Sequence, residues 1–372
     1  MDSVPEHVEV PSLSEPALET STQTPEPLPS TLRWIFHGPF GLRAGWSLLI
    51  YLGIIFLLGS AVNTAQKLVK QYQKEAAAHS ASGSTAPAAP AKAAAGQPQP
   101  IAAVIIGESV IFVVFLLLSW LMSAIERRKL AVYGFGGRHF LVRFLFGALW
   151  GLLAMSLLVA VLHTLHVLSF DARLDFGAKI LGWGALLALA FLLVGLVEEY
   201  IFRGYLQFTL TRAFVWLGEI ISPRHARAIA FWIASFFTSA LFLFAHTNNA
   251  GEDKMGLISV FLAGVIFVVA LWRTGSLWWA IGFHMSWDWA QSFLYGVPDS
   301  GGLLQGRLFA THASGNPLLS GGTVGPEGSV LVVPTVLLVI VVLLFTKPSP
   351  QPPLEPVPHN APAGTAGTRL FT

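Results

Sequence analysis

The sequence has no cysteine and few charged residues. Without cysteine its 372 residues form no disulfide, thiolate nucleophile or thiolate metal site. Only 11% of the residues are charged, against about 25% in an ordinary soluble domain. The 22 basic and 20 acidic residues leave a net charge of +2, which is no field for attracting a polyanion. We therefore expect no nucleic-acid partner, and any catalytic group has to come from Glu, Asp, His or Ser.

Several motifs that assign a chemistry directly are also missing. The sequence contains no His-Glu-x-x-His pair, no Gly-x-x-x-x-Gly-Lys phosphate loop and no Gly-x-Ser-x-Gly turn. The glycine-rich stretch 320–326 is interpreted as a loop before the last apolar segment. These absences give no support to a zincin protease, a P-loop nucleotide hydrolase or an α/β-hydrolase.

Long apolar runs are what the sequence does contain. Runs of about 17 to 25 residues recur, and each is long enough to cross the hydrocarbon core of a bilayer as a helix. Eight such segments are predicted near 45–62, 101–124, 144–167, 179–198, 229–246, 256–272, 276–295 and 330–346. The predicted fold class is all-α: a polytopic helix bundle of about eight transmembrane helices in a lipid bilayer.

Composition divides the chain into one membrane domain and three polar or small-residue segments. The integral domain is predicted over 31–347. The acidic, proline-rich segment 1–30 and the proline-rich tail 348–372 are predicted to be disordered. The alanine- and proline-rich segment 81–100 is predicted to be a flexible loop, because it has too little bulky apolar surface to pack.

Basic residues indicate an orientation in the membrane. The connection 126–143 carries five Lys or Arg residues and the connection 203–227 carries four, whereas Asp171, Glu252 and Asp299 fall in the alternate connections. By the positive-inside rule the two basic connections are cytoplasmic. With eight spans, both termini are then predicted to be cytoplasmic, in a multi-pass protein of a cell (inner) membrane.

A few ionisable side chains fall within the apolar segments, where a charge at mid-depth costs about 2.5 to 3.5 kcal/mol. Glu199 and Arg203 lie four residues apart, so they can form an ion pair on one helix face. Glu198 projects about 100° away from that pair and is free to act as a general base or acid. An ion pair that only anchors the helix in the headgroups is the alternative interpretation.

Histidines mark two further apolar segments. His284 and Asp288 lie four residues apart, a spacing that can orient an imidazole, hold a divalent metal or relay a proton. A hydrogen bond between helices is the alternative for this pair. His246 ends another segment four residues after Phe242, where a histidine also serves as a cap or an interfacial residue.

Together and in order, these residues resemble the three motifs of the CAAX protease and bacteriocin-processing (CPBP, or Abi) family of intramembrane endopeptidases. That family includes the type II CAAX prenyl proteases. The motifs are Glu198-Glu199-x-x-x-Arg203, Phe242-x-x-x-His246 and His284-x-x-x-Asp288. The resemblance covers about 178–295, which is predicted to be the catalytic core.

The resemblance implies an endopeptidase that cleaves a membrane-associated or prenylated protein or peptide. Glu198 and His246 would activate a water molecule, and His284 and Asp288 would stabilise the oxyanion. Zinc held by Glu198, His246 and His284 is the alternative, since the family is often labelled metalloprotease. Two other functions stay open: a non-catalytic scaffold or bacteriocin-immunity or maturation factor of the same fold, and a proton-coupled transporter.

The remaining motif residues Glu199, Arg203 and Phe242 are given supporting roles by the resemblance. Asp288 departs from the asparagine that family members often carry, and an ionised aspartate accepts hydrogen bonds but cannot donate one. It would therefore be protonated, orient His284 or bind a metal.

A simple hairpin would place Glu198 and His246 at opposite ends of their helices. A shared site requires either that the fourth helix continues past Arg203 or that the segment 203–227 dips back into the membrane.

Overall fold

The computed structural model describes residues 35–38, 41–81, 98–137, 139–175, 177–247, 249, 253–351 and 354. Its α-helices are α2 (Ala44–Ala81), α3 (Ile101–Ile125), α4 (Phe140–Thr164), α5 (Lys179–Glu199), α6 (Gln207–Ile221), α7 (Ala226–His246), α8 (Lys254–Thr274), α9 (Trp278–Trp289), α10 (Pro317–Ser320) and α11 (Val332–Leu344). Its strands are β1 (His37–Gly38), β2 (Gly41–Leu42), β3 (Leu168–Arg173) and β4 (Phe309–Ala313). Short turns are η1 (Leu130–Tyr133), η3 (Pro223–His225) and η5 (Pro326–Gly328), and η2 (Tyr200–Leu206) and η4 (Ala290–Leu294) are π-helical.

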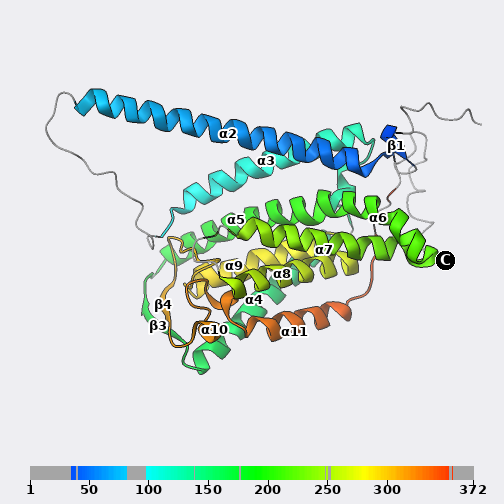
Figure 1. Ribbon diagram of the computed structural model, residues 1–372. Helices are drawn as coiled ribbons and strands as arrows, with labels where there is room; N and C mark the ends of the chain where they lie inside the picture. Colours follow the sequence, from blue (N-terminus) through cyan, green and yellow to red (C-terminus); the bar gives the residue numbers. More distant parts are fainter. Residues whose placement is uncertain are drawn as a thin grey trace, which may run out of the picture.

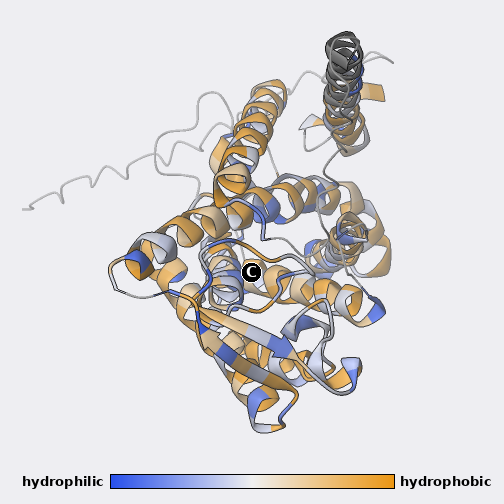
Figure 2. Cartoon of the chain, turned by 90° about the vertical axis from the view of Figure 1, so that its left-hand side faces the viewer, coloured by the Kyte–Doolittle hydropathy of each residue, from blue (hydrophilic) through white to orange (hydrophobic). Residues whose placement is uncertain are grey.

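The chain is a bundle of apolar helices, which confirms the predicted fold class. Among the described residues, six helical stretches are long and apolar enough to cross a membrane: Ala44–Ala61, Ile101–Ile125, Phe140–Thr164, Lys179–Ile221, Pro223–His246 and Lys254–Thr274. The last two of the eight predicted spans are shorter, with 12 residues in α9 and 13 in α11. Hydrophobic residues cover much of the outward surface of the helices (Figure 2), as expected for a protein that faces lipid.

The fourth span is a single helix twice the predicted length. From Lys179 to Ile221 the backbone stays helical for 43 residues, about 65 Å at 1.5 Å per residue. The predicted end of this span at 198 is therefore wrong. The helix instead passes through the π turn η2, a local widening that often marks functional sites in helices. Glu198 and Arg203 consequently lie in the middle of a continuous helix, on either side of the start of η2.

Close backbone packing at glycines joins α4 to α9 in the core. A Cβ atom on Gly147 would lie 2.0 Å from the carbonyl oxygen of Trp279, and one on Gly151 would lie 2.3 Å from that of Phe283. From the opposite side, a Cβ on Gly282 would lie 2.1 Å from the carbonyl oxygen of Phe144. Glycines four residues apart let two membrane helices approach to backbone contact, and this contact holds the histidine-bearing helix α9 in place.

The two ends of the bundle differ (Figure 1). At one end β3 pairs antiparallel with β4, with Phe170 opposite Thr311 and an irregularity next to it. At the other end lie the α6–α7 junction and β1. The strands were not predicted, because β3 and β4 are short and pair across more than 130 residues of sequence. Helices α2 and α3 lie along one side of the remaining helices.

Part of the predicted disordered tail packs on the bundle. The Ser349 amide donates to the carbonyl of Arg273 at 2.8 Å, and the Gln351 side chain donates to that of Trp272 at 2.6 Å. Leu354 is 5% exposed. The predicted disordered segment 1–30 and residues 82–97 of the predicted loop lie outside the described residues.

Candidate active site

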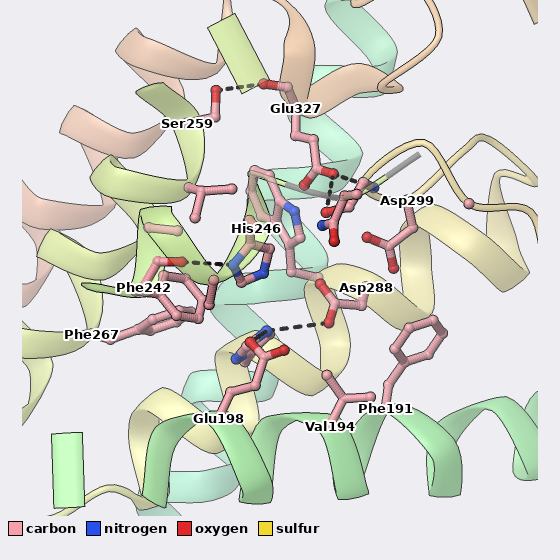
Figure 3. A pocket seen from close by; sticks show the side chains of 18 of the residues that line it. Phe191, Val194, Glu198, Phe242, His246, Ser259, Phe267, Asp288, Asp299 and Glu327 are labelled. Atoms are coloured by element: carbon pink, nitrogen blue, oxygen red, sulfur yellow. Dashed lines mark hydrogen bonds and ion pairs between the residues drawn. The ribbon is translucent and has the colours of Figure 1, made fainter. Parts of the chain in front are cut away.

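A cavity of about 440 Å³ lies between the helices and extends to the connections beside β4 (Figure 3). It is lined by side chains of α3, α5, α7, α8 and α9 and by the connection before α11. Its ionisable lining residues are Glu198, His246, His284, Asp288, Asp299 and Glu327. Four carboxylates and two imidazoles thus share one cavity, and no lysine or arginine is among its described lining residues.

Glu198 and Glu199 point to different surroundings, as their adjacent helix positions predict. The Glu198 side chain is 24% exposed and reaches the cavity, whereas the Glu199 side chain is completely buried. Glu199 Oε1 accepts a hydrogen bond from Arg203 Nη1 at 3.1 Å, and the Arg203 side chain is also completely buried. The ion pair therefore lies inside the bundle, which excludes the alternative of a headgroup anchor.

Aromatic rings surround the buried Arg203 guanidinium. Its central carbon lies 4.1 Å from the ring centre of Phe242 and 5.0 Å from that of Phe267. Among the described residues, Arg203 Nε and Nη2 have no hydrogen-bond partner, so the ring faces supply part of the stabilisation of this cation. Phe242, the first residue of the second motif, thus covers the ion pair of the first.

His284 is held between three carboxylates. Its Nδ1 lies 3.2 Å from Glu199 Oε1, and its Nε2 lies 3.4 Å from Asp288 Oδ2 and 3.6 Å from Glu198 Oε2. The imidazole also stacks on Phe267, with ring centres 5.0 Å apart and planes 20° apart. Ionised carboxylates only accept hydrogen bonds, so this arrangement favours an imidazolium with a proton on each nitrogen. Glu199 thereby links Arg203 to His284.

His246 presents one ring nitrogen as a base. Its Nδ1 donates to the carbonyl oxygen of Phe242 at 2.8 Å, which leaves Nε2 of the neutral ring as an acceptor. The residue is level with Glu198 because the long helix continues to Ile221 and α7 runs back along α6. A shared site required either a fourth helix that continues past Arg203 or a segment 203–227 that dips back into the membrane. The structure has the first of these, the continuous helix.

Two ionisable cavity residues, Asp299 and Glu327, were not predicted as part of the site. Glu327 Oε1 accepts hydrogen bonds from the Ser300 amide and from Ser300 Oγ, the latter at 3.1 Å. Asp299 Oδ2 accepts from Ser292 Oγ at 3.3 Å. Figure 3 shows Asp299 and Glu327 on the side of the cavity opposite Glu198. No local sequence signal identifies them, because they belong to connections that reach the cavity only through the tertiary fold.

The two carboxylates at this side of the cavity have perturbed proton affinities. Burial, and then the nearby charge of Glu327, raises the pKa of Asp299 well above its usual value. Burial also raises the pKa of Glu327, although the hydrogen bonds from Ser300 oppose that shift. Each group therefore binds its proton more tightly in the folded protein than in the unfolded chain.

The arrangement of the described residues does not fit the zinc alternative. No group of three or more His, Asp or Glu side chains among them is placed to hold a metal ion. Both nitrogens of His284 face carboxylates, and Nδ1 of His246 is bonded to a backbone carbonyl.

The fold and cavity define a class: a polytopic helical membrane protein with an acid and histidine site inside its bundle. Residues 180–290 match the family model described as Rce1-like, type II CAAX prenyl endopeptidase. The matched segment contains all three motifs and confirms the resemblance to CAAX proteases. No curated protein and no solved structure matches the chain significantly.

Proposed function

We propose that the protein is an intramembrane endopeptidase that hydrolyses peptide bonds of a membrane-associated protein or peptide. The proposal rests mainly on one observation: Glu198 and His246 line the same cavity beside His284. Glu199 in turn contacts Nδ1 of His284 and fixes its ring. The match to the Rce1-like family over the same segment supports this reaction class.

In the proposed reaction, Glu198 and His246 position a water molecule, and one of them takes its proton. The hydroxide attacks the carbonyl carbon of the scissile peptide bond. The carbon–nitrogen bond of the resulting tetrahedral intermediate then breaks, and the same base returns the proton to the leaving amine. His246 Nε2 has the free lone pair that this step needs, and Glu198 is the more exposed of the two adjacent glutamates.

His284 is assigned to the developing oxyanion. Its Nε2 points between Glu198 and Asp288, and an N–H there can donate a hydrogen bond to the oxyanion when substrate is bound. Asp288 lies beside that nitrogen and would hold the ring in place between turnovers. Glu199 and Arg203 are positioning residues, since they act through His284 and the helix and do not line the cavity.

The lining of the cavity suits an extended peptide segment with apolar side chains. Apolar side chains such as Phe191, Val194 and Phe202 accompany the polar groups, so an extended peptide with apolar side chains fits. Prenylated CAAX-type segments and unlipidated segments are both included in the proposal.

The test is cleavage of a peptide library by the detergent-purified protein. The library contains internal membrane-segment peptides and prenylated CAAX peptides, and wild type is compared with Glu198→Gln and His246→Asn. We expect each variant to lose about 10²-fold or more in rate, as for removal of a general base. Glu219→Gln is the matched control, because Glu219 lies exposed near the end of the same long helix.

The outcome separates this proposal from its alternatives. Cleavage by wild type and Glu219→Gln but not by Glu198→Gln supports the peptidase. Sensitivity of that cleavage to a chelator would reinstate a metal-bound water. If folded wild type cleaves no peptide that Glu198→Gln leaves intact, the proposal is wrong, and a scaffold or a maturation or immunity factor of this fold is favoured.

A further inference from the structure

Among the described residues, the lining of the cavity reaches the connections at one end of the bundle only. Besides helix residues, its lining includes Gln99, Asn249, Asp299, Ser300 and Glu327, which lie in the connections before α3, after α7 and on both sides of β4. At the opposite end, the connections 126–139, 222–225, 275–277 and 345–351 contribute no lining residue. The cavity therefore lies toward the end of the bundle that carries β3 and β4 (Figure 1).

The opposite end of the bundle is the basic one. Six of its basic side chains lie in or beside short connections: Arg127, Lys129, Arg224, Arg227, Arg273 and Lys347. Four more, Arg43, Arg128, Arg143 and Arg212, belong to the same end. Hydrogen bonds tie this end together: Arg143 donates to Ser349, whose amide donates to the Arg273 carbonyl.

The end with the cavity opening carries fewer basic side chains. Among the described side chains these are Lys67, Arg173, Lys179, Lys254 and Arg307, five against ten at the opposite end. Connections rich in Lys and Arg stay on the cytoplasmic side when a membrane protein inserts. The ten-residue cluster therefore faces the cytoplasm, and the cavity opens on the other face.

From this juxtaposition we infer that the active-site cavity is loaded from the non-cytoplasmic face of the membrane. Its substrate is then a segment of a membrane or exported protein that lies on that face, close to the bilayer. Only this substrate statement rests on the proposed function; the side on which the cavity opens does not.

The absence of cysteine from the sequence permits a direct test. Single cysteines are introduced at Ala313, on the exposed part of β4, at Asn249, in the cavity lining, and at His225, exposed at the α6–α7 junction. None of these residues belongs to the proposed catalytic machinery, and the wild-type chain is the unlabelled control. Intact bacterial cells that produce each variant are treated with a membrane-impermeant maleimide, before and after permeabilisation.

We expect A313C and N249C to be labelled to the same extent before and after permeabilisation, and H225C to be labelled only afterwards. The reverse pattern would overturn the inference, because the cavity would then open to the cytoplasm. Equal labelling of A313C and H225C in intact cells would also overturn it, because the chain would then have no single orientation.

A second measurement addresses the substrate. A membrane-impermeant peptide that the purified enzyme cleaves is added to right-side-out and to inverted membrane vesicles. Cleavage only by right-side-out vesicles supports loading from the non-cytoplasmic face, and cleavage only by inverted vesicles contradicts it. If the labelling is as expected but the purified protein cleaves no peptide, the proposed function fails while the orientation stands.

Discussion

At the residue scale, two adjacent glutamates have separate tasks because one helical step separates their surroundings. Glu199 is completely buried and binds both Arg203 and His284, whereas Glu198 reaches the cavity. Removing one partner of a buried ion pair typically destabilises a protein by about 3 to 5 kcal/mol. A Glu199 variant could therefore lose activity because the protein unfolds and not because the reaction is slower. Glu198 is the more informative position for a catalytic test.

Asp288 gives the sharpest prediction for a single residue. The variant Asp288→Asn keeps an acceptor 3.4 Å from His284 Nε2 and adds an amide donor that can face the oxyanion. We expect the kcat of this variant to stay close to that of wild type. Asp288→Leu removes both functions and should lower kcat by about 10² to 10³, the usual effect of losing an oxyanion-hole group.

The measurement is kcat and KM of both variants on the best peptide from the library. Because both substitutions remove the same charge and differ in hydrogen bonding, a loss common to both would identify the charge as the essential feature. If Asp288→Asn is as inactive as Asp288→Leu, Asp288 works as an ionised carboxylate, and the proposed exchange with an asparagine is wrong.

At the scale of elements, the position of α9 depends on the glycines that it shares with α4. The third motif lies on α9, and α9 is only 12 residues long before its π turn. Its contact with α4 is at backbone distance at Gly147, Gly151 and Gly282. His284 on α9 is therefore positioned by glycines, which carry no side chain of their own.

A single methyl group should test this packing. Gly147→Ala places a Cβ 2.0 Å from the Trp279 carbonyl oxygen, so the helices have to separate. We expect a loss of about 1 to 3 kcal/mol of stability, typical of overpacking, measured as the thermal unfolding midpoint in detergent. Gly182→Ala on α5 is the matched control, since a Cβ there meets no atom within 4 Å. Equal midpoints for the two variants would show that α4 and α9 are not closely packed.

At the scale of the whole molecule, the connections on both sides of β4 place acidic groups at one side of the cavity. The raised pKa of Asp299 means that the folded chain binds this proton more tightly than the unfolded chain does. The resulting stabilisation is complete below about pH 3.9, the pKa of an aspartate in the unfolded chain. It is lost as the pH rises through the pKa that Asp299 has in the folded protein. Each tenfold gain in proton affinity on folding corresponds to about 1.4 kcal/mol of stability.

Replacing Asp299 should therefore flatten the dependence of stability on pH. We expect the thermal midpoint of wild type to fall more steeply above about pH 4 than that of Asp299→Asn. Intrinsic fluorescence of the 12 tryptophans in detergent provides the readout. Glu219→Gln, at an exposed glutamate near the end of the long helix, should follow wild type. Parallel curves for wild type and Asp299→Asn would mean that the Asp299 carboxyl does not gain proton affinity on folding.

The membrane class, the positions of most spans and the residues of the three motifs could all be predicted from the sequence. These features are local: an apolar run long enough to cross a bilayer remains apolar in any packing, and residues four apart share a helix face. The ion pair between Glu199 and Arg203 follows from that spacing alone, and the structure contains it.

How those residues meet depends on the tertiary structure. The predicted hairpin separated Glu198 from His246, whereas the helix continues to Ile221 and α7 returns along it to the same depth. Asp299 and Glu327 reach the cavity through long-range packing, for which a single sequence carries no periodic signal. The side on which the cavity opens depends on the same packing, because it follows from which connections gather at each end of the bundle.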